Sequence, residues 1–95
     1  MTSHLQEFRV LCESRKVLRK LWHNLVVCAL EFREQKSKYV LRSRQEGTML
    51  TVELVLLKKL EDNFMSAINE LRDVCEQNNI FMTRFTLNEI CDLYS

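Results

Sequence analysis

The sequence predicts an all-α fold, in which a long antiparallel helical hairpin of coiled-coil type carries a short C-terminal helix. The 95 residues include one glycine and no proline, too few for the repeated turns of a sheet protein. Apolar residues recur every seven positions in both halves. Residues 1–46 hold ten Lys/Arg and five Asp/Glu, and residues 47–95 hold four Lys/Arg and eight Asp/Glu. A hairpin therefore pairs a basic half with an acidic half. We expect residues 1–95 to form a single helical domain.

The first helix is expected over about residues 3–45. Ser3 and Gln6 have the spacing of a capping box, in which two side chains satisfy free backbone N–H groups at the start of a helix. From there an apolar residue falls at every seventh position, which keeps one apolar stripe on one face of the helix. The members of this stripe are Leu11, Leu18, Leu25, Phe32 and Tyr39.

A turn at about residues 46–48 and a second helix at about residues 49–78 follow. Gly47 suits the position just after a helix end, and Thr48 suits the N-cap of the next helix. A continuous helix through Gly47 stays open as an alternative, because a glycine inside a helix costs only about 1 kcal/mol. The second stripe consists of Leu50, Leu57, Phe64 and Leu71, with Leu54, Leu60, Ala67, Ile68, Val74 and Cys75 beside it.

A turn centred near residues 46–47 also sets the register of the hairpin. Facing residues then have numbers that sum to about 93, and the hairpin is about 60 Å long. The large Phe64 side chain meets the small Ala29 in this register, as close packing requires. The other expected pairs are Trp22 with Leu71, Leu25 with Ile68, Leu18 with Cys75, and Tyr39 with Leu54.

Thr86 and Glu89 repeat the capping-box spacing and open a short helix at about residues 86–94. This helix can fold back over part of the hairpin. Near the turn, however, the chain has more apolar positions than two facing stripes need, and such a surface usually marks an interface. We therefore expect oligomerisation or a partner chain to complete a bundle there. The predicted interface residues are Val40, Leu41, Met49, Val52, Val55 and Leu56.

No pattern of residues favours catalysis, a cofactor or a metal. One glycine leaves no Gly-rich phosphate loop, and Cys28 and His23 lie five positions apart, so they diverge on a helix. Cys12 and Cys28 point to opposite sides, because sixteen steps of about 100° amount to a rotation of roughly 160°. We expect a non-enzymatic protein with free, mostly buried cysteines.

Four basic residues in the first helix form a ladder of i,i+4 neighbours: Arg15, Lys16, Arg19 and Lys20. Such a ladder suits an acidic partner or nucleic-acid phosphates, although no recognition motif accompanies it. Residues 2–20 lack the apolar core of a signal peptide, and the apolar run 25–30 is too short to span a bilayer. We expect a cytoplasmic or nuclear protein that does not act on membranes.

The expected function is protein–protein interaction. The chain would serve as an adaptor, a scaffold or an obligate subunit of an intracellular complex, by helix packing with a copy of itself or with a different chain. The alternative is a protein associated with nucleic acid, in chromatin or a ribonucleoprotein, that uses the basic ladder. Both hypotheses concern surfaces whose exposure depends on the tertiary structure.

Overall fold

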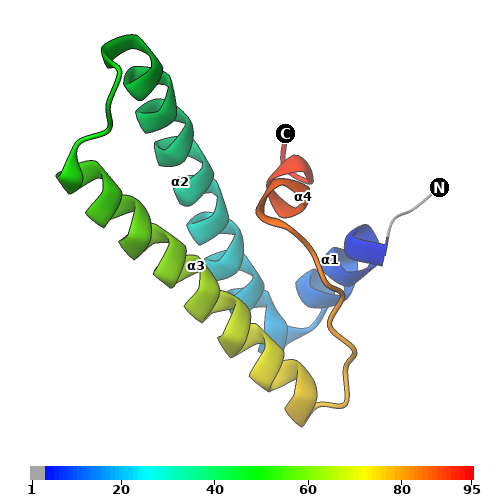
Figure 1. Ribbon diagram of the computed structural model, residues 1–95. Helices are drawn as coiled ribbons and strands as arrows, with labels where there is room; N and C mark the ends of the chain where they lie inside the picture. The colour runs from blue at the N-terminus through cyan, green and yellow to red at the C-terminus, as the bar shows by residue number, and fades with distance from the viewer. Residues whose placement is uncertain (1–3) are drawn as a thin grey trace.

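The computed structural model describes residues 4–95, which form four helices and contain no strand. The helices are α1 (His4–Ser14), α2 (Lys16–Glu46), α3 (Thr51–Gln77) and α4 (Leu87–Asp92). Helices α2 and α3 pack side by side as an antiparallel hairpin (Figure 1). The predicted all-α hairpin with a short C-terminal helix is therefore confirmed.

The single first helix expected over residues 3–45 is wrong, because the chain breaks at Arg15. The Arg15 backbone is extended, with φ −101° and ψ 123°, and its carbonyl accepts the first hydrogen bonds of α2. The break lets α1 fold back and bury Phe8 and Cys12 in the common core. The longest dimension is consequently 48 Å, shorter than the expected hairpin. The Ser3 half of the predicted capping box lies outside the described residues.

Gly47 ends α2 and reverses the chain, as predicted. Its φ of 84° is in the left-handed region that favours glycine, and its N–H donates to the Ser43 carbonyl at 2.7 Å. The expected N-cap at Thr48 is wrong, because α3 begins only at Thr51. The Leu50 N–H donates to the Glu53 carboxylate at 3.0 Å, so a side chain three residues further along caps this helix.

The later start of α3 shifts the register of the hairpin. The residue numbers sum to 96 for the Phe32 and Phe64 rings, which are tilted by 41° with centroids 6.4 Å apart, and to 95 for the Arg42–Glu53 ion pair. Both sums exceed the expected 93, because the connection occupies residues 47–50. Leu54 is accordingly 54% exposed, and its predicted burial against Tyr39 is wrong.

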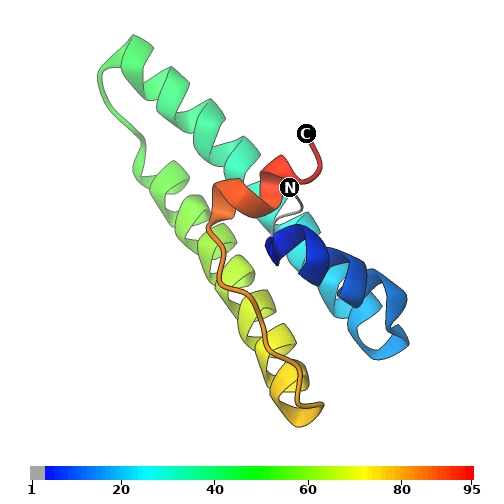
Figure 2. The same ribbon diagram turned by 90° about the vertical axis from the view of Figure 1, so that its right-hand side faces the viewer.

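A third layer covers one face of the hairpin. Helices α1 and α4 lie on the same side of it in Figure 1, and both stand in front of it in Figure 2. We call residues 80–86, which connect α3 to α4 without regular structure, the strap. The predicted capping box opens α4, since Thr86 and Glu89 each bond the other's backbone N–H. Thr86 is thus the N-cap, and the helix ends two residues earlier than expected.

The apolar core ends well short of the hairpin turn. Among residues 4–95, every buried apolar residue belongs to residues 5–32 or 64–91, and from residue 33 to residue 63 the only buried side chain is that of Glu53. In both views the turn end of the hairpin projects beyond α1 and α4 (Figures 1 and 2). One end of the molecule therefore consists of two helices with no third layer over them.

Candidate functional site

At the projecting end, a charged pair occupies the space between the helices. Arg42 on α2 donates from Nε to Glu53 Oε2 at 2.9 Å, and a second guanidinium nitrogen bonds Glu53 Oε1. Arg42 also bonds Glu46 one helical turn along. Only 9% of the Glu53 side chain is exposed, against 27% for Arg42. An ion pair with two hydrogen bonds therefore takes one inward position that an apolar stripe normally fills, beside the partly buried Met49 and Leu57.

The aliphatic side chains at this end point outward instead. Val52 is 70% exposed and Val55 64%, and Leu41 and Leu56 are also exposed. These four belong to the predicted interface. Of its other two members, Met49 and Val40 are partly buried, and Val40 borders the start of α4. The structure thus places all six predicted residues at the turn end of the hairpin and leaves four of them exposed, Leu56 least of the four.

Leu50 and Leu54 are exposed there as well, although the sequence pattern assigned both to the stripe between the helices. Leu50 precedes the first turn of α3, so the helical period does not apply to it. Leu54 lies two heptads before Ile68, which is buried next to the strap. No third layer reaches Leu54. We define the apolar tip surface as Leu41, Leu50, Val52, Leu54, Val55 and Leu56.

The apolar tip surface carries almost no charge of its own. From Gly47 to Leu57 the sequence contains one ionisable side chain, Glu53, and Arg42 neutralises it. Complete burial of one such aliphatic side chain contributes about 1.5–3 kcal/mol. An exposed surface of aliphatic side chains without charge is suited to binding another apolar surface.

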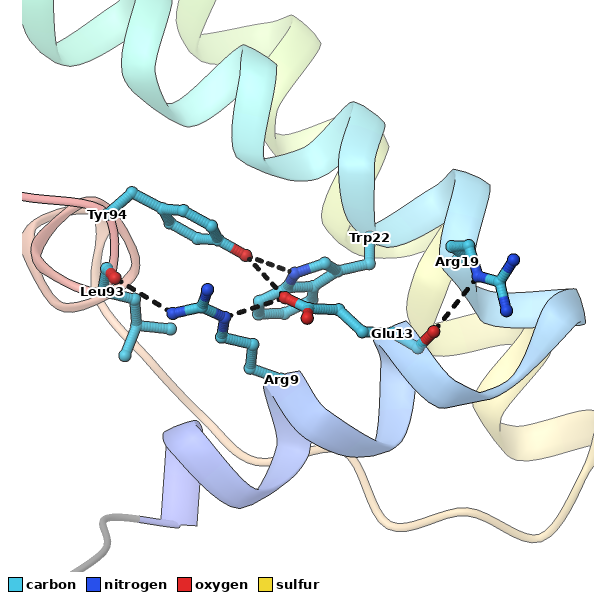
Figure 3. A network of polar contacts seen from close by, with 6 residues as sticks. All are labelled: Arg9, Glu13, Arg19, Trp22, Leu93 and Tyr94. Atoms are coloured by element: carbon cyan, nitrogen blue, oxygen red, sulfur yellow. Dashed lines mark hydrogen bonds and ion pairs between the residues drawn. The ribbon is translucent and has the colours of Figure 1, made fainter.

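The basic ladder lies at the other end of α2, where α1 meets it. All four of its side chains are exposed, and none forms an ion pair with a carboxylate of residues 4–95. Arg19 donates from Nε to the Glu13 backbone carbonyl at 3.1 Å, which holds the Arg19 side chain against the end of α1 (Figure 3). Arg15, Lys16 and Lys20 are exposed to solvent.

A second polar cluster, which the sequence pattern did not reveal, holds the C-terminus against α1 and α2 (Figure 3). Trp22 Nε1 donates to the Tyr94 hydroxyl at 2.7 Å, and that hydroxyl donates to Glu13 Oε1 at 3.3 Å. Arg9 donates to Glu13 at 2.8 Å and to the Leu93 carbonyl at 3.0 Å, with its guanidinium 4.3 Å from the centre of the Tyr94 ring. Because Leu93 and Tyr94 lie more than seventy positions from the residues that they contact, no local spacing could predict the cluster.

The cluster also changes the acidity of its members. The hydrogen bond from Arg9 lowers the pKa of Glu13 below its ordinary value. Burial raises the pKa of Tyr94, which keeps the hydroxyl neutral and able to donate. The hydrogen bonds of the cluster connect Leu93 and Tyr94, which follow α4, to α1 and α2.

The four cysteines are free thiols, as predicted, and only Cys28 is not fully buried. Burial raises the pKa of Cys12 to about 12, and burial likewise raises the pKa of the other three. Thiols of this kind are poor nucleophiles at neutral pH, because the thiolate is the reactive form. Within the described residues, no three His, Cys, Asp or Glu side chains are grouped so as to hold a metal ion.

Comparison of the chain with protein-family models, with curated proteins and with solved structures finds no match. Among residues 4–95, no helix has both the length and the apolar character needed to cross a bilayer.

Proposed function

We propose that this protein is a non-enzymatic interaction module, an adaptor or subunit of an intracellular complex, which binds another protein chain through the apolar tip surface. One observation carries the proposal: from residue 33 to residue 63 the buried side chain is that of the ion-paired Glu53, whereas the six aliphatic side chains of the apolar tip surface are exposed. A helix pair that had only itself to satisfy would place them the other way round. This arrangement is favourable when a partner chain covers the apolar tip surface.

The rest of the chain cannot cover this surface in the folded arrangement. Helix α4 is held to the middle of α2 by the ion pair of Asp92 with Arg33 and by the hydrogen bond of Tyr94 with Trp22. Both anchors are at least two helical turns from Leu41, the first residue of the tip surface, and Leu41 stays exposed although the start of α4 borders Val40. The free thiols fit a reducing compartment, where thiols stay reduced.

The test replaces two exposed members of the tip surface with charged residues, in the double variant Val52→Glu/Leu56→Glu. We expect the wild-type chain to form a dimer, or to bind a partner chain, and the double variant to lose that association at equal helicity. Light scattering coupled to size exclusion measures the mass, and pull-down measures partner binding. Val17→Glu is the matched control, because Val17 is 52% exposed on the other end of α2. Unchanged mass and pull-down in the double variant would reject the proposal.

The unpaired basic ladder supports a second candidate function, binding to nucleic acid. Clustered cations without carboxylate partners bind phosphates with an affinity that falls steeply with salt. Titration of a generic DNA duplex at several salt concentrations measures this directly. Binding that is salt-sensitive and abolished in the variant Arg15→Glu/Arg19→Glu/Lys20→Glu would support it. Absence of binding below millimolar duplex would eliminate it.

A further inference from the structure

A groove separates the C-terminal half of α3 from the strap, far from the apolar tip surface. It encloses about 600 Å³, within the range of about 300–1,000 Å³ that is usual for binding clefts. Phe64 and Ile68 from α3 are buried at its apolar floor, and Phe85 from the strap is partly buried. The remaining lining residues are Met65, Met82, Thr83, Arg72 and Arg84.

The two arginines of this groove lack an acidic partner. Arg72 donates to the neutral amide oxygen of Asn69 at 3.0 Å, and Arg84 forms no hydrogen bond or ion pair with residues 4–95. Residues 47–95 have a surplus of acidic groups and only four basic ones. Two of those four nevertheless line one groove without a counter-charge. The groove therefore combines an apolar floor with two guanidinium groups that are free to bind a carboxylate.

The strap also offers free backbone groups. The Ile80 N–H donates to the Cys75 carbonyl at 2.8 Å and the Thr86 N–H donates to Glu89, but residues 81–85 between them form no hydrogen bond within the described chain. In Figure 2 the strap is an extended trace in front of α3, and Figure 1 shows that it lies on the α1 side of the hairpin. Phe81 projects from it, 86% exposed. An extended backbone with free N–H and C=O groups is a ready template for a second extended chain.

We propose that this groove binds an extended segment of a partner protein in which an Asp or Glu residue stands beside a large apolar residue. The apolar side chain packs on Phe64 and Ile68, the carboxylate binds Arg72 and Arg84, and the main chain pairs with residues 81–85. A fatty carboxylate would leave the strap backbone unmatched, and a nucleic acid would supply no apolar anchor. A peptide matches all three features.

The experiment selects random twelve-residue peptides displayed on phage against the full-length chain. We expect enriched peptides to carry Asp or Glu beside Leu, Met or Phe. Fluorescence anisotropy with the best labelled peptide then measures affinity, and Arg84→Gln weakens binding by about tenfold or more, because a charge-assisted hydrogen bond is lost. Arg44→Gln, at an exposed arginine near the hairpin turn, is the matched control and leaves affinity unchanged.

Two comparisons make the result specific. The double variant Val52→Glu/Leu56→Glu keeps full peptide affinity, which separates this groove from the tip surface. Sodium decanoate and single-stranded oligothymidylate are tested as competitors, and displacement by either at lower concentration than by unlabelled peptide would reassign the groove. Selection without enrichment, enriched peptides without acidic residues, or equal affinity for wild type, Arg72→Gln and Arg84→Gln would overturn the proposal. Circular dichroism verifies the fold of each variant.

Discussion

Disruption of the ion pair inside the hairpin turn tests the physical basis of the outward-facing apolar surface. We consider Glu53→Gln and Arg42→Met, singly and together. Glutamine keeps the size of the side chain and an oxygen that can still accept the Leu50 N–H, so the start of α3 keeps its cap. Methionine keeps the apolar stem of Arg42 and removes its charge. The pair interaction is thereby separated from packing and from capping.

The expected loss in free energy of unfolding follows from how deeply the Arg42–Glu53 pair is buried. An exposed ion pair contributes about 0–1 kcal/mol, whereas breaking a fully buried one costs about 3–5 kcal/mol. Glu53 has 9% of its side chain exposed and Arg42 has 27%, which puts this pair between the two limits. We expect Glu53→Gln to lower the free energy of unfolding by about 1–2 kcal/mol, since Arg42 keeps Glu46. Arg42→Met leaves the Glu53 carboxylate without a cation, at a cost of about 2–3 kcal/mol.

The double variant distinguishes a specific pair from two independent effects. With both charges gone, no uncompensated carboxylate remains, and the loss should fall below that of Arg42→Met alone. The coupling energy of the cycle should be about 1–2 kcal/mol. Urea unfolding at pH 7 measures each value by circular dichroism, and Trp22 fluorescence reports on the other end of α2. Coincident transitions by the two probes justify a two-state analysis.

Additive single effects, with a coupling energy under about 0.3 kcal/mol, would refute this reasoning. The ion pair would then be screened by water, and its inward position would say nothing about the outward aliphatic side chains. The support for an interaction surface at the turn would fall with it.

Three further predictions concern other parts of the chain. Gly47→Ala should lower the free energy of unfolding by about 1–2 kcal/mol through left-handed backbone strain alone, because a Cβ there meets no atom within 4 Å. Urea midpoints measure this loss of stability, and an unchanged midpoint would contradict the prediction. Iodoacetamide should alkylate Cys28 first and Cys12 only as the chain unfolds, since burial raises the Cys12 pKa to about 12, and mass spectrometry detects each labelled cysteine. Early labelling of Cys12 would show that α1 detaches readily. Arg9 lowers the pKa of Glu13 in the folded state, so the Glu13 carboxylate stabilises the fold above its unfolded pKa of about 4.5, and this stabilisation disappears as the pH falls through the lower folded pKa. The drop in the urea midpoint from pH 7 to pH 3 should therefore be smaller in Glu13→Gln than in the wild type. An equal drop would show that Glu13 does not contribute to the pH dependence of stability.

Local patterns in the sequence predicted the elements that depend on neighbouring residues. The seven-residue period and the position of Gly47 predicted the hairpin, and the Thr86–Glu89 spacing predicted the start of α4. Each of these signals lies within one or two helical turns, and its physics does not depend on the rest of the fold. The free state of the cysteines followed from the same helical geometry.

The break at Arg15 could not be read from the period, because the apolar stripe continues through it without a gap. It is favourable only because α1 then buries Phe8 and Cys12 on α2. The register was missed for a related reason. The shift of two or three residues depends on how long the connection is before α3 begins at Thr51, and nothing in the spacing of the leucines encodes that length.

Sequence alone predicted two long amphipathic helices with an excess of aliphatic residues near Gly47, and it favoured a reversal there over a continuous helix. Tertiary structure decided which of those aliphatic residues face water, because burial at the turn depends on whether a third layer reaches it. It also decided that Trp22 meets Tyr94 and that Arg72 and Arg84 line one groove. Such contacts join residues far apart along the chain, so they are set by the packing of whole helices, which no local spacing can specify.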